Sequence, residues 1–215
     1  MEITNEAVED YIRGLLARHD EPVLLEMEAE GAERGFPIVG RMVGVVLEII
    51  ARAVGAKRIF ELGSGYGYSA YWFSRAVGSE GEVHLTDGDA ANEAKAVDYL
   101  GRAGLSGPVR FHVGEAVETL RGTDGEFDIV YNDIDKGDYP KAWRAARDRI
   151  RIGGLFISDN TLWSGRVTGA SVEEDRRPGW TVAIKEMNET IAADPGFISS
   201  ILPIRDGVTV AIRLR

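Results

Sequence analysis

The chain has 215 residues, a formal net charge of −10 at pH 7, 44% hydrophobic and 28% charged residues, and no cysteine. This composition is typical of one soluble globular domain, excludes disulfides, thiolate chemistry and cysteine-ligated zinc, and disfavours non-specific binding to nucleic acid or anionic membranes. No apolar run reaches the length of a membrane span, and the N-terminus lacks a signal-peptide pattern. We therefore expect a cytoplasmic protein without a membrane partner, with residues 1–215 as one domain.

Residues 1–55 are predicted to be helical. Helices are expected over residues 5–20 and 22–34, separated at Pro22, and over residues 38–54, where apolar side chains recur at helical spacing. We expect this segment to form a helical cap on a core of residues 56–215. Its apolar faces could pack on a sheet or pair two subunits.

Strands and helices alternate from residue 56 to residue 193. This alternation predicts an α/β fold, a doubly wound, Rossmann-like sheet of seven mostly parallel strands with right-handed crossovers. The last two strands, joined across residues 205–207, are expected to form a C-terminal antiparallel β-hairpin, which is not the usual dinucleotide-binding layout. The predicted strands span residues 58–62, 83–86, 109–113, 127–132, 155–158, 198–203 and 208–214, and the predicted helices residues 69–77, 90–103, 116–120, 139–150 and 180–193.

A glycine-rich turn follows the first of these strands. Gly63, Gly65 and Gly67 stand between the strand and a helical pattern. Such a turn lets a ligand approach the backbone closely, and the helix start offers free N–H groups. A dinucleotide fingerprint, Gly-x-Gly-x-x-Gly, would need a third glycine where Tyr68 stands, so that match fails. The alternative is an ordinary strand-to-helix turn that binds nothing.

Two acids flank this turn. Glu61, two residues before the first glycine, would repel a pyrophosphate but could favour a cationic ligand such as S-adenosylmethionine, which has a sulfonium and an ammonium but no phosphate. Asp87 ends the second strand, where a carboxylate can accept hydrogen bonds from both hydroxyls of a ribose. A lone acid after a strand is commonly a helix N-cap, the role that we assign to Asp89. Glu61 and Asp87 together are more specific than either acid alone.

The fourth and fifth strands also end in polar residues. Asp133 and Lys136 follow the fourth strand, and Asp159 and Asn160 follow the fifth, so parallel strands bring all four to the edge that holds the glycine-rich turn. Two carboxylates and an amide carbonyl suit Mg²⁺, with Mn²⁺ or Ca²⁺ as alternatives. A divalent ion lowers the pKa of a bound substrate hydroxyl, and Lys136 is the candidate to accept its proton. The alternative is that these residues are turn formers and N-caps.

Four segments carry a resemblance to a known family. These are Glu61–Ser69, Asp133–Lys136, Asp159–Trp163 and Leu202–Val208. From about Gly35 to the C-terminus, the chain resembles class I S-adenosylmethionine-dependent O-methyltransferases of the cation-dependent group, which contains catechol and caffeoyl-CoA O-methyltransferases. The resemblance implies a methyltransferase with S-adenosylmethionine, a divalent cation and a small hydroxylated substrate, assembled as a homodimer.

The same resemblance assigns roles to individual positions. Lys136 falls on the catalytic lysine of the family, with Asp133 beside it. The metal ligands correspond to Asp133, Asp159 and Asn160. The cofactor contacts correspond to Val39, Glu61, Gly63, Ser64, Ser69, Asp87, Ala116, Asp133 and Asp135.

Departures from the family pattern leave the substrate open. Asn132 replaces an apolar residue before the metal-site aspartate, Ser164 replaces a polar substrate contact, and the loop of residues 165–178 matches no subgroup. The first hypothesis is a small, catechol-like aromatic acceptor, on which Trp163 or Trp180 could stack, although packing is as good a role for both. The alternatives are an enzyme of the same fold that methylates a hydroxylated uridine in tRNA, a non-catalytic cofactor-binding module and, as a remote fourth, a nicotinamide dehydrogenase.

Other charged and titratable residues are predicted to be structural. Arg147, Arg149 and Arg151 form the best local basic patch for RNA, but we prefer a solvated helix end. His84 and His112 lie on predicted strands and show no acid partner by spacing, so we expect satisfied structural histidines rather than ligands.

Overall fold

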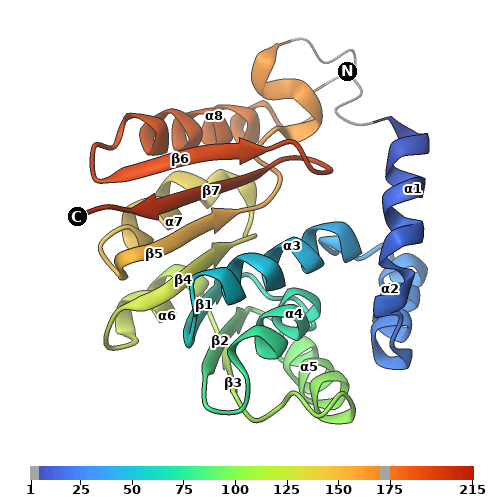
Figure 1. Cartoon of the computed structure of the whole chain (residues 1–215). Coiled ribbons are helices and arrows are strands. Elements are labelled where there is room, and N and C mark those ends of the chain that lie inside the picture. The colour runs from blue at the N-terminus through green and yellow to red at the C-terminus, as the bar shows by residue number, and fades with distance from the viewer. Residues whose placement is uncertain (1–4, 170–174) are drawn as a thin grey trace.

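A single sheet organises the chain. In the computed structural model, which describes residues 5–169 and 175–215, its seven strands follow the order β3-β2-β1-β4-β5-β7-β6 (Figure 1). Strands β1 to β5 are parallel, and β7 runs antiparallel to both of its neighbours, so the predicted fold class is confirmed. The strands are β1 (Arg58–Leu62), β2 (Glu82–Asp87), β3 (Val109–Val113), β4 (Phe127–Asn132), β5 (Ile150–Ser158), β6 (Phe197–Leu202) and β7 (Val208–Arg213).

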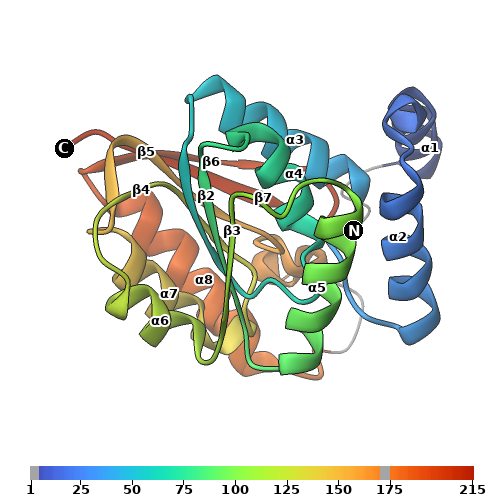
Figure 2. The ribbon, with the colours of Figure 1, turned by 90° about the horizontal axis from the view of Figure 1, so that it is seen from below.

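Helices cover both faces of this sheet. Helices α3, α4 and α5 pack on one face, and α6, α7 and α8 pack on the other (Figure 2). Helices α1 and α2 stand beside the sheet (Figure 1). The helices are α1 (Glu6–Leu16), α2 (Pro22–Arg34), α3 (Gly40–Ala53), α4 (Tyr68–Val77), α5 (Ala90–Arg102), α6 (Ala116–Gly122), α7 (Tyr139–Ala146) and α8 (Pro178–Ala193), with 3-10 helices η1 (Ala17–His19), η2 (Lys136–Asp138) and η3 (Trp163–Thr168).

Two apolar cores lie on the two faces of the sheet. Successive side chains of a strand point to opposite faces, so in β1 Ile59 joins the core under α3 and α4, whereas Phe60 and Leu62 join the core under α6 and α7. All three side chains are fully buried. Burying each contributes about 1.5–3 kcal/mol, which makes β1 a rigid base for the turn that follows it.

Local signals in the sequence set the helix ends. Asp89 caps α5 by accepting a hydrogen bond from the backbone N–H of Ala91 at 2.8 Å, as predicted. Pro22 stands in the first turn of α2, where its missing N–H leaves no hydrogen bond unmade. Gly35 then ends α2 in the left-handed conformation, with φ of 61°, which favours glycine.

The prediction for the α7–β5 region is wrong at two boundaries. Helix α7 ends at Ala146 rather than at Ile150, and β5 begins at Ile150 rather than at residue 155. Ile150 pairs with Phe127 of β4, and its apolar side chain also fits a helical period, which misled the sequence analysis. Gly154 lies so close to β4 that a Cβ atom there would be 2.8 Å from the carbonyl oxygen of Asp128, and it belongs to β5.

The predicted solvated helix end is also wrong. Arg147 pairs with Asp194 at 2.8 Å, and Arg151 pairs with Asp128 at 2.5 Å. Arg149 donates to backbone carbonyls, among them that of Leu120 at 2.9 Å. The three arginines therefore connect α7 and β5 to their neighbours, and they do not form a free basic patch.

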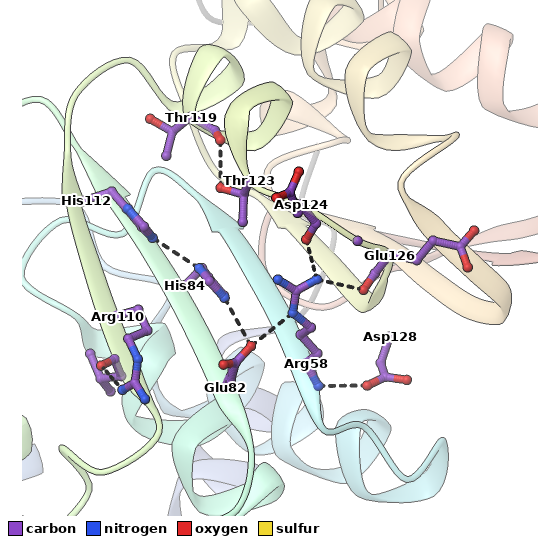
Figure 3. Close-up of polar contacts among 12 residues, drawn as sticks. Arg58, Glu82, His84, Arg110, His112, Thr119, Thr123, Asp124, Glu126 and Asp128 are labelled. Atoms are coloured by element: carbon purple, nitrogen blue, oxygen red, sulfur yellow. Dashed lines mark hydrogen bonds and ion pairs between the residues drawn. The ribbon is translucent and has the colours of Figure 1, made fainter.

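A histidine pair joins β2 to β3 (Figure 3). Nδ1 of His84 lies 3.1 Å from Nε2 of His112, and Nε2 of His84 lies 3.5 Å from Oε2 of Glu82, which also pairs with Arg58. Burial lowers the pKa of both histidines. They are hydrogen-bonded structural residues, as predicted, but His84 does have an acid partner, because positions two apart in a strand share one face.

Helix α2 lies at the carboxyl ends of the parallel strands. The hydroxyl of Tyr66, in the turn after β1, donates to the carbonyl of Met27 at 2.9 Å, and that of Tyr68 donates to Glu28 at 2.6 Å. No helix in the described parts of the chain is long and apolar enough to cross a membrane. Part of the predicted loop of residues 165–178 lies outside the described residues, and its earlier part forms η3.

Candidate active site

A cavity of about 1060 Å³ opens at the carboxyl ends of the parallel strands. This is the edge of the sheet at which the sequence placed the site. Its wall runs from α2 through the strand tips to α8 and the β6–β7 turn. The predicted site residues on this wall are Val39, Gly63, Ser64, Ser69, Asp87, Ala116, Asp133, Asp135, Lys136, Asp159 and Asn160.

The glycine-rich turn after β1 is packed tightly against two neighbouring strands. Gly63 has φ of 80°, and a Cβ atom there would lie 2.7 Å from the carbonyl oxygen of Asp133. The N–H of Ser64 donates to the carbonyl of Thr86 at 2.8 Å, and that of Gly65 donates to the carboxylate of Asp87 at 3.1 Å. Only glycine fits this close approach at position 63, and the turn leaves its outer side open to the cavity.

Asp87 is held in one orientation by three donors. One carboxylate oxygen accepts from Gly65, and the other accepts from the N–H of Asp89 at 2.8 Å and from the side-chain amide of Asn92 at 3.1 Å. A carboxylate fixed in this way at the cavity wall presents its remaining lone pairs to a ligand. This geometry suits the predicted contact with the ribose hydroxyls of the cofactor.

Glu61 lies directly behind the wall rather than on it. Its side chain is fully buried, one oxygen accepts a hydrogen bond from the hydroxyl of Ser69, and the other has no hydrogen-bond partner among the described residues. Burial, helped by the nearby charges of Asp133 and Asp87, raises the pKa of Glu61 to about 8. A cation bound in front of Ser69 would compensate this carboxylate, which fits a ligand with an ammonium or a sulfonium.

Two carboxylates, the half-buried Asp133 and the buried Asp159, stand directly after β4 and β5. Asp159 is 3% exposed, and its Oδ1 atom has no hydrogen-bond partner in the described part of the chain. Burial, and then the charge of Asp133, raise the pKa of Asp159 to about 7, and burial also raises that of Asp133. Asn160 follows in the left-handed conformation, with φ of 54°. Two carboxylates and an amide oxygen, one of them unpartnered, fit a divalent cation.

This donor set is small. Within residues 5–169 and 175–215, no three histidine, aspartate or glutamate side chains gather in an arrangement that could hold a metal. A cation at this site would therefore depend on Asp133, Asp159 and the amide of Asn160, with its other positions open to substrate or water.

Lys136 stands beside these carboxylates at the start of η2. Its Nζ atom lies 2.8 Å from Oδ1 of Asp133 and 3.3 Å from the carbonyl oxygen of Ile134. The side chain is 13% exposed. A lysine amine in this position reaches any group that binds at Asp133.

Arg205 is a site residue to which the sequence analysis gave no role. It lies in the β6–β7 turn with φ of 50° and lines the cavity. Its guanidinium donates to the carbonyls of Ile38 and Val39, which lie 167 and 166 positions earlier in the chain. The sequence drew attention to Leu202–Val208 only through its resemblance to the family. The contact of Arg205 with Ile38 and Val39 forms only in the folded chain.

Two tryptophans also line the cavity. The ring centroids of Trp163 and Trp180 are 5.7 Å apart at an angle of 46°. Arg177 lies over the Trp180 ring, with its Cζ atom 4.0 Å from the ring centroid. One cavity thus brings together the glycine-rich turn, the oxygen donors of Asp133, Asp159 and Asn160, and the two tryptophans.

Comparisons with known proteins identify the family of the chain. Residues 18–214 match the model of a family described as O-methyltransferase. The chain is 33% identical over 183 residues to tricin synthase 1 of Oryza sativa subsp. japonica, covering 79% of this chain and 71% of the relative. It is 30% identical over 218 residues to a catechol O-methyltransferase of Niastella koreensis, covering 96% of each.

A solved structure extends the likeness to the fold. The O-methyltransferase TomG from Streptomyces achromogenes, which is involved in tomaymycin synthesis and was crystallised in complex with S-adenosylmethionine, superposes with a TM-score of 0.85. The two are 25% identical, and the match covers 97% of this chain and 96% of TomG. The predicted resemblance is confirmed: the chain belongs to the O-methyltransferase family and is an S-adenosylmethionine-dependent methyltransferase.

Proposed function

We propose that the chain transfers the methyl group to a hydroxyl of a small, catechol-like aromatic with the help of a divalent cation. The observation that carries this proposal is the convergence of Asp133, Asp159 and Asn160 on the cavity wall that also contains the glycine-rich turn. Mg²⁺ is the proposed cation, and the same oxygen set suits Mn²⁺ or Ca²⁺. The relative named catechol O-methyltransferase supports a catechol-like acceptor.

On the cofactor side, the proposed contacts follow the wall from β1 to β4. Asp87 would accept the ribose hydroxyls, and Glu61 would compensate a positive charge of the methionine end through its buried carboxylate. Gly63 and Ser69 would lie against the ligand. The other proposed cofactor contacts are Val39, Ser64, Ala116, Asp133 and Asp135.

On the acceptor side, the chain has to align two groups and remove a proton. A bound divalent cation supplies Lewis acidity, which makes an aromatic hydroxyl easier to deprotonate. Lys136 is assigned to accept that proton, because its amine lies within hydrogen-bond distance of Asp133, where the acceptor would bind. The sulfonium methyl is already activated, so alignment is the protein's main contribution.

A methyl-transfer assay on catechol tests this proposal. We expect turnover that EDTA abolishes and Mg²⁺ restores. Asp159→Ala should abolish turnover and leave the affinity for S-adenosylhomocysteine, measured by calorimetry, largely unchanged, because the residue belongs to the proposed cation set. Asp138→Ala is the matched control, since it removes an exposed carboxylate from the same wall. Turnover that survives EDTA, or wild-type activity in Asp159→Ala, would overturn the metal assignment.

The relatives reported above give the tRNA alternative no support, and the three arginines that could have formed a basic patch make internal contacts instead.

We further propose that residues 1–215 act as one methyltransferase domain, in which residues 1–55 cap the core. A homodimer through the N-terminal helices remains our proposal for the assembly, and light scattering coupled to size-exclusion chromatography tests it.

A further inference from the structure

Arg177 is a cation on the cavity wall that makes no ion pair with the described residues. It lines the cavity, and its guanidinium lies 4.0 Å from the Trp180 ring centroid, a cation–π distance. In the parts of the chain that the structure describes, no carboxylate oxygen lies within ion-pair distance of its side-chain nitrogens. Its nearest acid in sequence, Asp175, accepts hydrogen bonds from the Arg177 backbone and from Thr181 instead.

Trp180 connects Arg177 to the proposed catalytic residues. The Trp180 ring lies against η2, where a Cβ atom at Gly137 would be 3.6 Å from the indole. Gly137 directly follows Lys136. Arg177, Trp180 and Lys136 therefore succeed one another along the cavity wall.

Arg177 differs in charge from most of the cavity wall, and in its contacts from the other two cations on it. The wall is predominantly acidic, and its carboxylates are Glu28, Asp87, Glu115, Asp133, Asp135, Asp138 and Asp159. Two other cations on it are engaged, since Lys136 pairs with Asp133 and Arg205 donates to backbone carbonyls. A guanidinium that stacks on an aromatic ring keeps its edge N–H groups available, and their spacing matches a carboxylate.

The geometry points to an acceptor that is an anionic aromatic: a ring with adjacent hydroxyls at the Lys136 end and a carboxylate that binds Arg177. Such a substrate would be repelled by this acidic wall unless a cation received its charge. Arg177 is thus a specificity-determining residue for the substrate. This inference rests on the proposed function and narrows its substrate class.

Paired substrates that differ only in charge test it. We expect the wild-type enzyme, with Mg²⁺ present, to show a lower KM for 3,4-dihydroxybenzoate than for the neutral 3,4-dihydroxybenzamide. Arg177→Gln should raise the KM for the acid about 10-fold, the size of one charge-assisted hydrogen-bonded contact, and leave kcat and the KM for the amide unchanged. Arg177→Lys keeps the charge but loses the planar fork. Its KM for the acid should lie between those of wild type and Arg177→Gln.

Arg166→Gln is the matched control. Its guanidinium lies 5.8 Å from the Trp163 ring centroid, but Arg166 is absent from the described wall of the cavity, so neither KM should change. Equal wild-type KM values for acid and amide, or an equal rise of both in Arg177→Gln, would overturn the inference and leave the proposed function standing. If neither compound is methylated although S-adenosylhomocysteine binds, the proposed function fails and the inference falls with it.

Discussion

Glu61 is a carboxylate whose protonation depends on its surroundings. Without a ligand, burial holds its pKa at about 8, so the group is largely neutral at pH 7. A cation bound in front of Ser69 would favour the ionised form. Binding of the cofactor at neutral pH should therefore release a proton from the protein.

Calorimetry in buffers of different ionisation enthalpy measures this release. We expect the heat of binding of S-adenosylmethionine to vary with the buffer in wild type, and to be independent of the buffer in Glu61→Gln, which should also bind more weakly. Glu115→Gln is the control: hydrogen bonds from Glu118 and Lys141 lower the pKa of Glu115, so it is already ionised at pH 7. A wild-type heat that does not depend on the buffer would contradict the placement of Glu61 beside a positive charge.

The turn between β1 and α4 has little room for a side chain at Gly63. Gly63→Ala would put a Cβ atom 2.7 Å from a backbone oxygen of Asp133, directly after β4, and would also hold an alanine at φ of 80°. We expect it to lower both the free energy of unfolding and the affinity for the cofactor, because the turn must move away from its neighbour.

Gly104→Ala separates the effect of the close approach to Asp133 from the effect of the positive φ. Gly104 also has a positive φ, 69°, but no atom lies within 4 Å of the place that a Cβ atom would occupy there. The left-handed conformation alone costs about 1–2 kcal/mol for a residue with a Cβ atom. Urea unfolding should show a larger loss for Gly63→Ala than for Gly104→Ala, and equal losses would mean that the close approach to Asp133 contributes nothing.

The elements also show why some features could be predicted and others could not. β1, β3 and β4 were predicted with their observed bounds, because turn residues flank short apolar runs. Asp133 and Asp159 were brought together by topology alone, since parallel strands end at one edge. Ile150 was misassigned because one apolar residue fits both a helix and a strand. Arg205 was missed because its contact with Ile38 spans 167 positions, and no local pattern encodes that distance.

At the scale of the whole molecule, the histidine pair should make stability depend on pH. Burial lowers the pKa of His84 and His112 below 6.5 in the folded chain, so the unfolded chain takes up protons first as the pH falls. The contribution of the two neutral histidines to the free energy of unfolding is complete above about pH 6.5. It is lost as the pH falls towards their pKa values in the folded chain. Asp159 and Glu61 act in the opposite sense, because their raised pKa values favour the folded state as the pH falls through them.

Comparing variants isolates the histidine contribution. The double variant His84→Gln, His112→Gln keeps polar side chains but cannot titrate. We expect the melting temperature of wild type to fall more steeply between about pH 7 and pH 5 than that of the variant, since only wild type carries the histidine term. Parallel curves over this range would show that the pair does not couple folding to protons.

The position of β7 has a consequence for the order of assembly. Strand β7 lies inside the sheet, bonded to β5 on one side and to β6 on the other, and Thr209 pairs with Ser158, the residue before Asp159. Until β7 is in place, β5 has an open edge, and the turn that carries Arg205 is not held beside the carbonyls of Ile38 and Val39. Strands β1 to β5 can therefore pair before the β6–β7 hairpin does, but the cavity wall is complete only when β7 has joined the sheet.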